Sequence, residues 1–272
     1  MSRHAGTSFV SLQHMISRKN LLRGLRNPGL SFVLIRRWFP WAASRNDREC
    51  QHLISAWSSG RLRRSSLRDL FPGIDACSVV VRKAEARTVG WSLDLQELVH
   101  LLSIVKLTKP KRSLEIGTYD GFTALNIAAN LEPGSEVRTV DLPQNQEQSI
   151  LRNSGISNAC ISDIIGSKFR REPEEARIQQ IWGDSSREDW ASFGAPFDLI
   201  LIDGSHDYPY VRSDSLNAVK SANPGATILW HDYGQCVDVS RAVDELSRNY
   251  PVHAILGTRF ACLRMPELKA RA

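Results

Sequence analysis

The most informative stretch of the chain is Ser113-Leu114-Glu115-Ile116-Gly117-Thr118-Tyr119-Asp120-Gly121-Phe122-Thr123. It begins as a short strand and then enters a turn in which two glycines let the backbone fold tightly and approach a ligand without a Cβ atom in between. Its form, E-x-G-x-x-x-G-x-T, is not the dinucleotide fingerprint, which needs a glycine where Tyr119 stands, and it lacks the Gly-Lys-Ser/Thr of a P-loop. The stretch therefore predicts a ligand-binding turn of a different kind.

Strand and helix patterns alternate around this stretch from Trp91 onward, which is typical of a parallel sheet with helices on both faces. An apolar face at helical spacing from Leu93 to Val105 predicts the first helix, and the unbroken apolar run from Leu199 to Ile202 predicts a strand buried on both faces. We expect further strands at 137–142, 180–184, 226–230, 252–256 and 260–265, and helices at 123–131, 209–222 and 237–248. The poorly patterned residues 143–178 predict one helix and a long loop near the ligand.

The composition excludes several classes of protein. The chain has 272 residues, of which 42% are hydrophobic and 24% charged, and these proportions are typical of a soluble globular protein rather than a disordered or collagen-like chain. Its five cysteines are scattered and form no C-x-x-C pair, which indicates neither a zinc site nor a disulfide framework. We therefore expect a protein of the reducing cytoplasm.

The charge is distributed unevenly along the chain. Residues 1–87 contain 16 Lys and Arg against 5 Asp and Glu, whereas residues 88–272 contain 19 against 24. The sequence thus predicts a basic, helical N-terminal region at 1–87 and a core α/β domain at 88–272. Such asymmetry indicates an anionic partner, which is nucleic acid, acidic lipid or the acidic remainder of the same protein.

Two segments of the N-terminal region mix bulky apolar and basic residues, at 21–26 and 32–39, as a helix at a membrane surface does. An Arg-rich helix packed over its own domain gives the same pattern. Nucleic acid is the least favoured partner, because no recognisable nucleic-acid module accompanies these residues. A cap over the active site, a contact in a homo-oligomer and a peripheral membrane location all stay open.

Four acids stand at the ends of predicted strands: Asp141, Asp184, Asp203 and Asp232. In an open parallel sheet, ligands bind outside the carboxyl ends of the strands. Several carboxylates on one rim repel one another unless a cation or a hydroxyl-rich ligand lies among them. The alternative is that each acid merely caps the helix that follows it.

The turn and these acids together resemble class I S-adenosylmethionine-dependent methyltransferases, whose first motif has an acid followed by two glycines. The resemblance implies a Rossmann-like, seven-stranded, mostly parallel sheet in which residues 260–265 form an antiparallel strand. It also implies that Asp141 binds both ribose hydroxyls of the cofactor and that Asp184 and Ser185 contact its adenine. The remaining cofactor-binding positions implied are Glu115, Gly117, Tyr119, Gly121, Thr123 and Asp203.

A narrower likeness lies in Ile202-Asp203-Gly204-Ser205-His206-Asp207-Tyr208 and Trp230-His231-Asp232-Tyr233. These segments resemble the macrocin-type and mycinamicin-type sugar O-methyltransferases and a related protein of cephamycin biosynthesis, over residues 90–265. The resemblance implies that His206 is the base and that Asp203 and Asp232 bind Mg²⁺. His231, at a position where the sugar methyltransferases have an acid, is the third candidate metal ligand. Because Mg²⁺ prefers oxygen ligands, this histidine leaves Mn²⁺, or no metal, open as well.

The leading expectation is an S-adenosylmethionine-dependent methyltransferase that acts on a hydroxyl of a small metabolite or saccharide. Coordination by a metal and removal of the proton by an imidazole would make a weakly acidic hydroxyl reactive. A nitrogen or carboxylate acceptor is a rival, since this fold hosts many chemistries. A catalytically silent scaffold, whose basic N-terminal region binds a membrane surface or a partner, is the alternative from another class.

Overall fold

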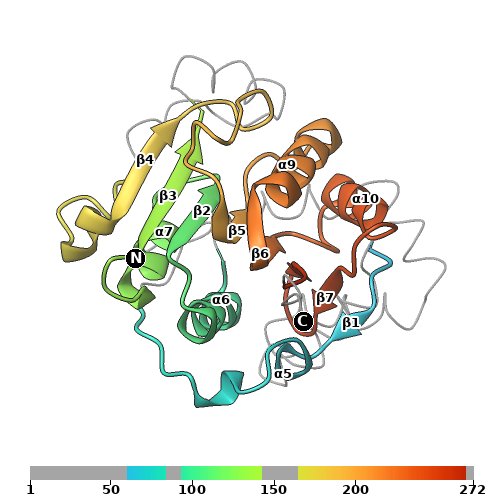
Figure 1. Ribbon diagram of the computed structural model, residues 1–272, viewed down its shortest axis with the longest axis horizontal. Coiled ribbons are helices and arrows are strands. Elements are labelled where there is room, and N and C mark those ends of the chain that lie inside the picture. Colours follow the sequence, from blue (N-terminus) through green and yellow to red (C-terminus); the bar gives the residue numbers. More distant parts are fainter. Residues whose placement is uncertain (1–59, 84–92, 143–164, 268–272) are drawn as a thin grey trace, which may run out of the picture. The chain divides into compact units, whose positions relative to one another are not determined.

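The computed structural model describes residues 60–83, 93–142 and 165–267, and one mixed sheet organises them (Figure 1). The sheet has eight strands in the order β1-β7-β8-β6-β5-β2-β3-β4. All neighbouring strands are parallel except β8, which runs antiparallel to both β6 and β7. This confirms the predicted Rossmann-like α/β fold and its antiparallel strand near the end of the chain.

The strands follow the predicted segments within a few residues. Their bounds are β1 Arg64–Ser65, β2 Arg112–Ile116, β3 Glu136–Asp141, β4 Ile178–Trp182, β5 Phe197–Ile202, β6 Ala222–Trp230, β7 His253–Ile255 and β8 Ala261–Arg264. The two-residue strand β1 adds an eighth strand to the seven that were expected, because Arg64 and Ser65 pair in parallel with Ala254 and Ile255 of β7.

Strand β6 begins at Ala222, four residues earlier than predicted from the Pro224-Gly225 pair. Phe197 pairs with Ala222, and the register then shifts before Leu199 pairs with Thr227. Pro224 lies within this irregular stretch, where its missing N–H is tolerated. Gly225 adopts φ 78°, and its N–H donates to the carbonyl of Pro266, so the proline and glycine shape the start of the strand instead of preceding it.

Helices cover both faces of the sheet (Figure 1). Helices α6 Leu95–Thr108 and α7 Phe122–Asn130 pack on one face, and α9 Tyr208–Ser221 and α10 Val237–Leu246 pack on the other. The side chains of β5 alternate between the two faces. Leu199 and Leu201 belong to the core under α6 and α7, and Ile200 and Ile202 belong to the core under α9 and α10. The prediction of a strand buried on both faces is confirmed.

Two helices begin directly at the rim where the site lies. Asp94 caps α6 through a hydrogen bond from the Glu97 N–H, and Glu97 in turn accepts from the Asp94 N–H, which is a capping box. Gly121, at φ 79°, is the residue before α7, and an added Cβ there would lie 2.4 Å from the ring of Phe169. The second glycine of the turn is therefore required by both conformation and space.

The chain divides into two compact units, Met1–Ser58 and Ser59–Ala272, and all described residues belong to the second. Residues 60–83, part of the expected basic region, contribute β1, the short helix α5 Leu67–Leu70 and the 3-10 helix η1 Ile74–Ala76, with Phe71 and Ile74 buried against α6. The expected interfacial segments 21–26 and 32–39, and most of the expected loop at 143–178, lie outside the described residues. The boundary after residue 87 stays a prediction.

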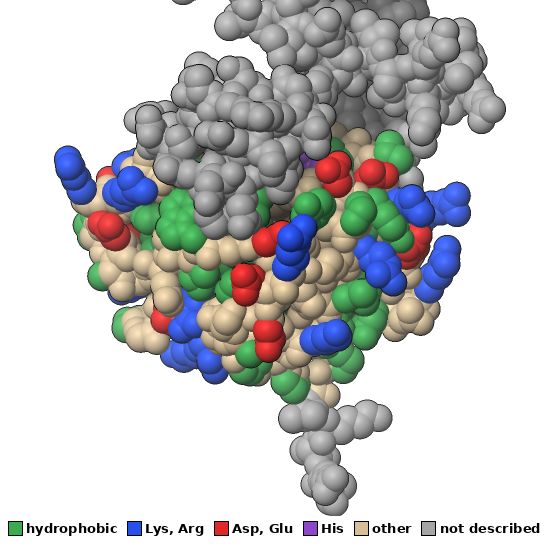
Figure 2. Space-filling view, turned by 90° about the horizontal axis from the view of Figure 1, so that it is seen from above, with side chains coloured by type: hydrophobic (Ala, Val, Ile, Leu, Met, Phe, Trp, Pro, Cys, Tyr) green, Lys and Arg blue, Asp and Glu red, His purple; other side chains and the backbone are tan. Residues whose placement is uncertain are grey.

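Figure 2 presents a face on which basic and acidic side chains are interspersed among apolar ones. Within the described ranges, no helix has the length and apolar character required to cross a bilayer.

Candidate active site

The glycine turn and the end of β5 are in direct contact. The Asp203 N–H donates to the Ile116 carbonyl, and Gly117, at φ 95°, passes so close that an added Cβ would lie 2.2 Å from the Asp203 carbonyl oxygen. Any side chain at residue 117 would push the turn away from β5, whatever its chemistry. Gly117 therefore sets the distance between the first loop and the acids at the ends of β5 and β6.

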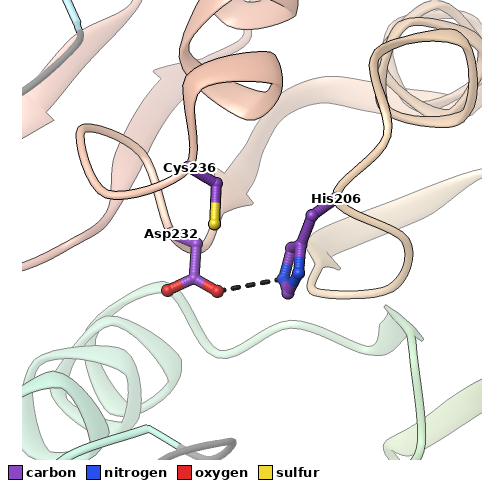
Figure 3. Close-up of side chains that lie close together, drawn as sticks. All are labelled: His206, Asp232 and Cys236. Atoms are coloured by element: carbon purple, nitrogen blue, oxygen red, sulfur yellow. Dashed lines mark ion pairs between the residues drawn. The ribbon is translucent and has the colours of Figure 1, made fainter. Parts of the chain in front are cut away.

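His206, from the loop after β5, meets Asp232 and Cys236, from the loop after β6, at the rim (Figure 3). His206 Nε2 lies 2.9 Å from Asp232 Oδ2, and the imidazole is half exposed. The hydrogen bond to Asp232 raises the pKa of His206 above its usual value. Burial raises the pKa of the Cys236 thiol to about 12, and the charge of Asp232 acts in the same direction, so this sulfur stays protonated near neutral pH.

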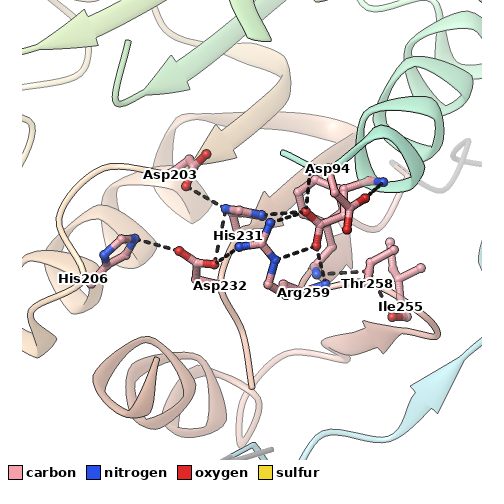
Figure 4. A network of polar contacts seen from close by, with 10 residues as sticks. Asp94, Asp203, His206, His231, Asp232, Ile255, Thr258 and Arg259 are labelled. Carbon is pink, nitrogen blue, oxygen red and sulfur yellow. Dashed lines mark hydrogen bonds and ion pairs between the residues drawn. The ribbon is translucent and has the colours of Figure 1, made fainter. Parts of the chain in front are cut away.

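His231 lies behind this pair, almost fully buried between two carboxylates (Figure 4). Its Nδ1 is 2.9 Å from Asp203 Oδ1, and its Nε2 is 3.1 Å from Glu97 Oε2. Burial by itself lowers the pKa of His231, but the charge of Asp203 and the hydrogen bonds to Asp203 and Glu97 outweigh burial and raise it to about 10. His231 is thus an imidazolium that donates from both nitrogens.

Arg259 completes the network from the turn between β7 and β8 (Figure 4). Its Nε and backbone N–H both donate to Glu97 Oε1, at 2.9 and 2.8 Å, and its Nη1 donates to Asp232 Oδ1 at 2.8 Å. Burial raises the pKa of Glu97, but its hydrogen bonds from His231 and Arg259 reverse this and lower it to about 2. Burial also raises the pKa of Asp232, but the hydrogen bond with His206 and the charges of His231 and Arg259 outweigh burial and hold it below its usual value.

Glu97 and Arg259 belong to this site although the sequence did not single them out. The pattern Asp94-x-x-Glu97 before an apolar run is a capping-box signature, and it could have placed Glu97 at a helix start. No local signal could have found Arg259, because its contact with Glu97 joins residues 162 positions apart.

Asp141 lies at the end of β3, as predicted, and holds the glycine turn. Its Oδ2 accepts from the N–H groups of Thr118 and Tyr119, at 2.9 and 3.0 Å, and its Oδ1 accepts from the Leu142 N–H at 2.8 Å. A carboxylate offers about four lone-pair directions, so these donors occupy most of its capacity. Both ribose hydroxyls can bind here only if a backbone donor is displaced, and the role of Asp141 stays a prediction.

Glu115 lies below the turn in β2 and is fully buried. It accepts from Thr139 Oγ1 at 2.5 Å, and burial raises its pKa well above the usual value, with the charge of Asp203 adding to this. Thr139 in turn contacts Thr118, which receives a hydrogen bond from the Gln180 amide at 3.0 Å. Glu115 therefore supports the loop from beneath, and Tyr119 and Thr123 lie within or just after that loop.

Asp184, which follows β4, contacts residues of its own turn. Its Oδ1 accepts from the N–H and hydroxyl of Ser186, and its Oδ2 pairs with Arg187. These bonds close a turn and cap no helix, because the described residues between β4 and β5 form turns only. The carbonyl of the neighbouring Ser185 accepts from the Trp190 indole, and the predicted adenine contacts of Asp184 and Ser185 are not tested by these bonds.

The three predicted metal ligands lie together, but their donor atoms are already engaged. One ligand atom from each of Asp203, His231 and Asp232 falls within 4.8 Å of the others. An imidazolium has no lone pair for a metal, and both oxygens of Asp232 already accept hydrogen bonds, from Arg259 Nη1 and from His206 Nε2. As arranged, this set fits a divalent cation poorly.

Residues 114–233 match the sequence family described as "Methyltransferase domain". The matched range runs from β2 to the residue after Asp232. It thus contains the glycine turn, Asp141, Asp203, His206 and His231, and it excludes Glu97 and Arg259.

The chain is also similar to solved methyltransferase structures at low identity. An O-methyltransferase from Bacillus cereus in complex with SAH is 17% identical, over 73% of this chain and 90% of that one, with a TM-score of 0.49. The O-methyltransferase TomG from Streptomyces achromogenes is 16% identical, over 82% and 100%, with a TM-score of 0.46. MycE from the mycinamycin biosynthetic pathway, in complex with Mg and SAH, is 19% identical, over 62% and 48%, with a TM-score of 0.39. The strand order, not these scores, carries the fold assignment.

Proposed function

We propose that this protein transfers a methyl group from S-adenosylmethionine to a hydroxyl oxygen of a small metabolite or saccharide, with His206 as the general base. The observation that carries the proposal is the His206–Asp232 pair, which stands at the rim of the sheet beside the end of β5. The family match over residues 114–233 supports methyl transfer as the reaction class. The narrower grouping with sugar O-methyltransferases, and with it the acceptor class, belongs to the proposal.

The rim suits a sulfonium nucleoside by its chemistry. The remaining lone pair of Asp141 can accept from one sugar hydroxyl, and from the second once a backbone donor is displaced. The left-handed conformations of Gly117 and Gly121 keep the loop beside it compact. When bound, the cofactor supplies an activated methyl group on a positively charged sulfur, which departs as a neutral thioether.

His206 has the geometry of an oriented base. Its Nε2–H donates to Asp232 Oδ2, so the tautomer is fixed and Nδ1 carries the lone pair. In the Ser-His-Asp triad a carboxylate accepts from Nδ1–H and Nε2 is the base; here the carboxylate accepts from Nε2–H and Nδ1 is the base. As the acceptor oxygen forms its bond to the methyl carbon and the carbon–sulfur bond breaks, Nδ1 takes the hydroxyl proton. The remaining task of the chain is in-line placement of oxygen, carbon and sulfur.

The first experiment separates cofactor binding from chemistry. Isothermal titration of the full chain with S-adenosylmethionine and S-adenosylhomocysteine should give one site, and no binding of either compound would contradict the cofactor assignment. Transfer of labelled methyl from the donor into a metabolite extract then identifies the acceptor.

With that acceptor, His206→Gln should lower turnover by roughly 10² to 10⁴ and leave cofactor affinity unchanged, the range for loss of a general base. His253→Gln, a histidine of β7 that contacts Ser65, is the matched control and should keep full turnover. Because Asp232 raises the pKa of His206, the activity of the parent chain should rise with pH through a midpoint above 6.5. Normal turnover in His206→Gln would refute the assignment.

A further inference from the structure

We propose that Arg259 supplies, from within the chain, the positive charge that a divalent cation would otherwise bring to this rim, and that the site therefore takes up no metal. The inference deepens the proposed function, since it names the group that neutralises the acids around the transfer site. It chooses among the possibilities that the sequence left open, which were Mg²⁺, Mn²⁺ and no metal.

The first step is the balance of charge. Three carboxylates, those of Glu97, Asp203 and Asp232, converge on His231, and Glu97 and Asp232 are buried. Buried carboxylates that repel one another need a cation in contact with them. The Arg259 guanidinium contacts two of the three, Glu97 through Nε and Nη2 and Asp232 through Nη1. Its planar fork suits this bridging role better than a point charge does.

The second step is that Arg259 is held in place by its backbone as well. Its N–H donates to Glu97 Oε1 at 2.8 Å, and its carbonyl accepts from the N–H of Tyr233, the residue after Asp232, at 2.9 Å. The β7–β8 turn is thus fastened both to the first turn of α6 and to the loop that carries Asp232. Displacing the guanidinium with a metal would leave Glu97 buried without its principal partner.

The third step concerns His231. Both of its ring nitrogens face carboxylate oxygens, at 2.9 and 3.1 Å, and each such contact requires an N–H. No ring lone pair is left for a metal in this arrangement. The position where the sugar methyltransferases have an acid is therefore occupied here by a second cation. His231 and Arg259 together neutralise acids that a metal would otherwise join.

The test measures binding of Mn²⁺ to the full chain by electron paramagnetic resonance and calorimetry, independently of methyl transfer. The parent chain and Arg259→Lys, which keeps the positive charge, should show no saturable site. Arg259→Gln should gain one Mn²⁺ site, with an affinity at least tenfold above the non-saturable binding of Mn²⁺ to the parent chain. Asp203→Asn in the Arg259→Gln background should remove this site. Should Arg259→Gln fail to fold, the double variant Glu97→Gln/Arg259→Gln removes both members of the buried pair and should gain the same site.

Two results would overturn the inference. One is a stoichiometric Mn²⁺ site in the parent chain that Asp203→Asn abolishes. The other is the absence of any gain in both folded variants that lack Arg259. Titration of S-adenosylmethionine in the same samples keeps the proposals distinct, because loss of cofactor binding would count against the methyltransferase function, whereas a metal site in a cofactor-binding chain would count against the role of Arg259 alone.

Discussion

Asp214 and Glu97 are both almost fully buried, yet their pKa values move in opposite directions. Glu97 has Arg259 and His231 within hydrogen-bond distance, and these cations keep it ionised. Asp214, on α9, has one carboxylate oxygen without a hydrogen-bond partner among the described residues. Burial raises its pKa to about 7, and the nearby charge of Asp184 adds to this. At the scale of single residues, the partner of a buried acid decides whether it is charged.

Asp214 makes stability depend on pH in a predictable direction. In the unfolded chain its carboxyl loses the proton near pH 3.8, whereas in the folded chain it keeps the proton up to about pH 7. The folded state therefore binds more protons in this window, and the stability of the parent chain falls as pH rises through it. Asp214→Asn cannot ionise, so relative to the parent it should gain on the order of a few kcal/mol between pH 4 and pH 8.

Urea unfolding of both chains at about pH 4.5 and pH 8 checks this expectation. Asp238→Asn, an exposed acid in the first turn of α10, is the control and should show a much smaller change with pH. A difference between Asp214→Asn and the parent that is equal at both pH values would show that Asp214 is not protonated in the folded state.

At the scale of elements, helix α6 begins where the site's polar network begins. Asp94 accepts from the Glu97 N–H at 2.8 Å and thereby caps the helix, while the Glu97 side chain continues into the contacts with His231 and Arg259. The same glutamate thus belongs to a capping box and to the site. A substitution at Asp94 therefore affects both the start of the helix and the polar network of the site.

We expect Asp94→Ala to cost about 0.5–2 kcal/mol of stability, because the first turn of α6 loses its side-chain acceptor. For a domain of this size each kcal/mol lowers the Tm by roughly 2–4 °C, which thermal denaturation resolves. Asp94→Ser keeps an acceptor oxygen at the cap and should retain most of the stability. Equal losses in the two variants would mean that the capping bond is not what holds the helix start.

The sequence was sufficient for the elements and insufficient for the network that joins them. The run Leu199–Ile202 predicted a doubly buried strand because periodicity is local, and the structure confirms it. The strand-end positions of Asp203 and Asp232 were likewise readable, since both acids directly follow or nearly follow apolar runs. The contacts of Glu97 and Arg259 depend on the β7–β8 turn meeting the start of α6, and that meeting is set by tertiary packing. No sequence pattern predicts this contact between the turn and the helix.

At the scale of the whole molecule, the positive charge is concentrated outside the unit that carries the site. Residues 1–58 contain 9 Lys and Arg against 2 Asp and Glu, and the remainder of the chain contains 26 against 27. The second unit, from Ser59 onward, contains the complete sheet and every residue of the polar network. The two parts therefore differ in charge as well as in contacts, and a truncation between them tests their roles separately.

We expect the full chain, but not a chain that starts at Ser59, to sediment with vesicles of phosphatidylcholine mixed with phosphatidylglycerol. Each Lys or Arg near an anionic surface contributes about 1 kcal/mol, so three engaged side chains would change the partition coefficient roughly a hundredfold. Raising the salt from about 0.1 M to about 1 M shortens the screening length from about 10 Å to about 3 Å and should release the full chain. Vesicles of phosphatidylcholine alone are the control. If the basic region instead meets acidic residues of the same protein, vesicle binding of the two chains will be equal and the truncated chain will unfold at a lower temperature.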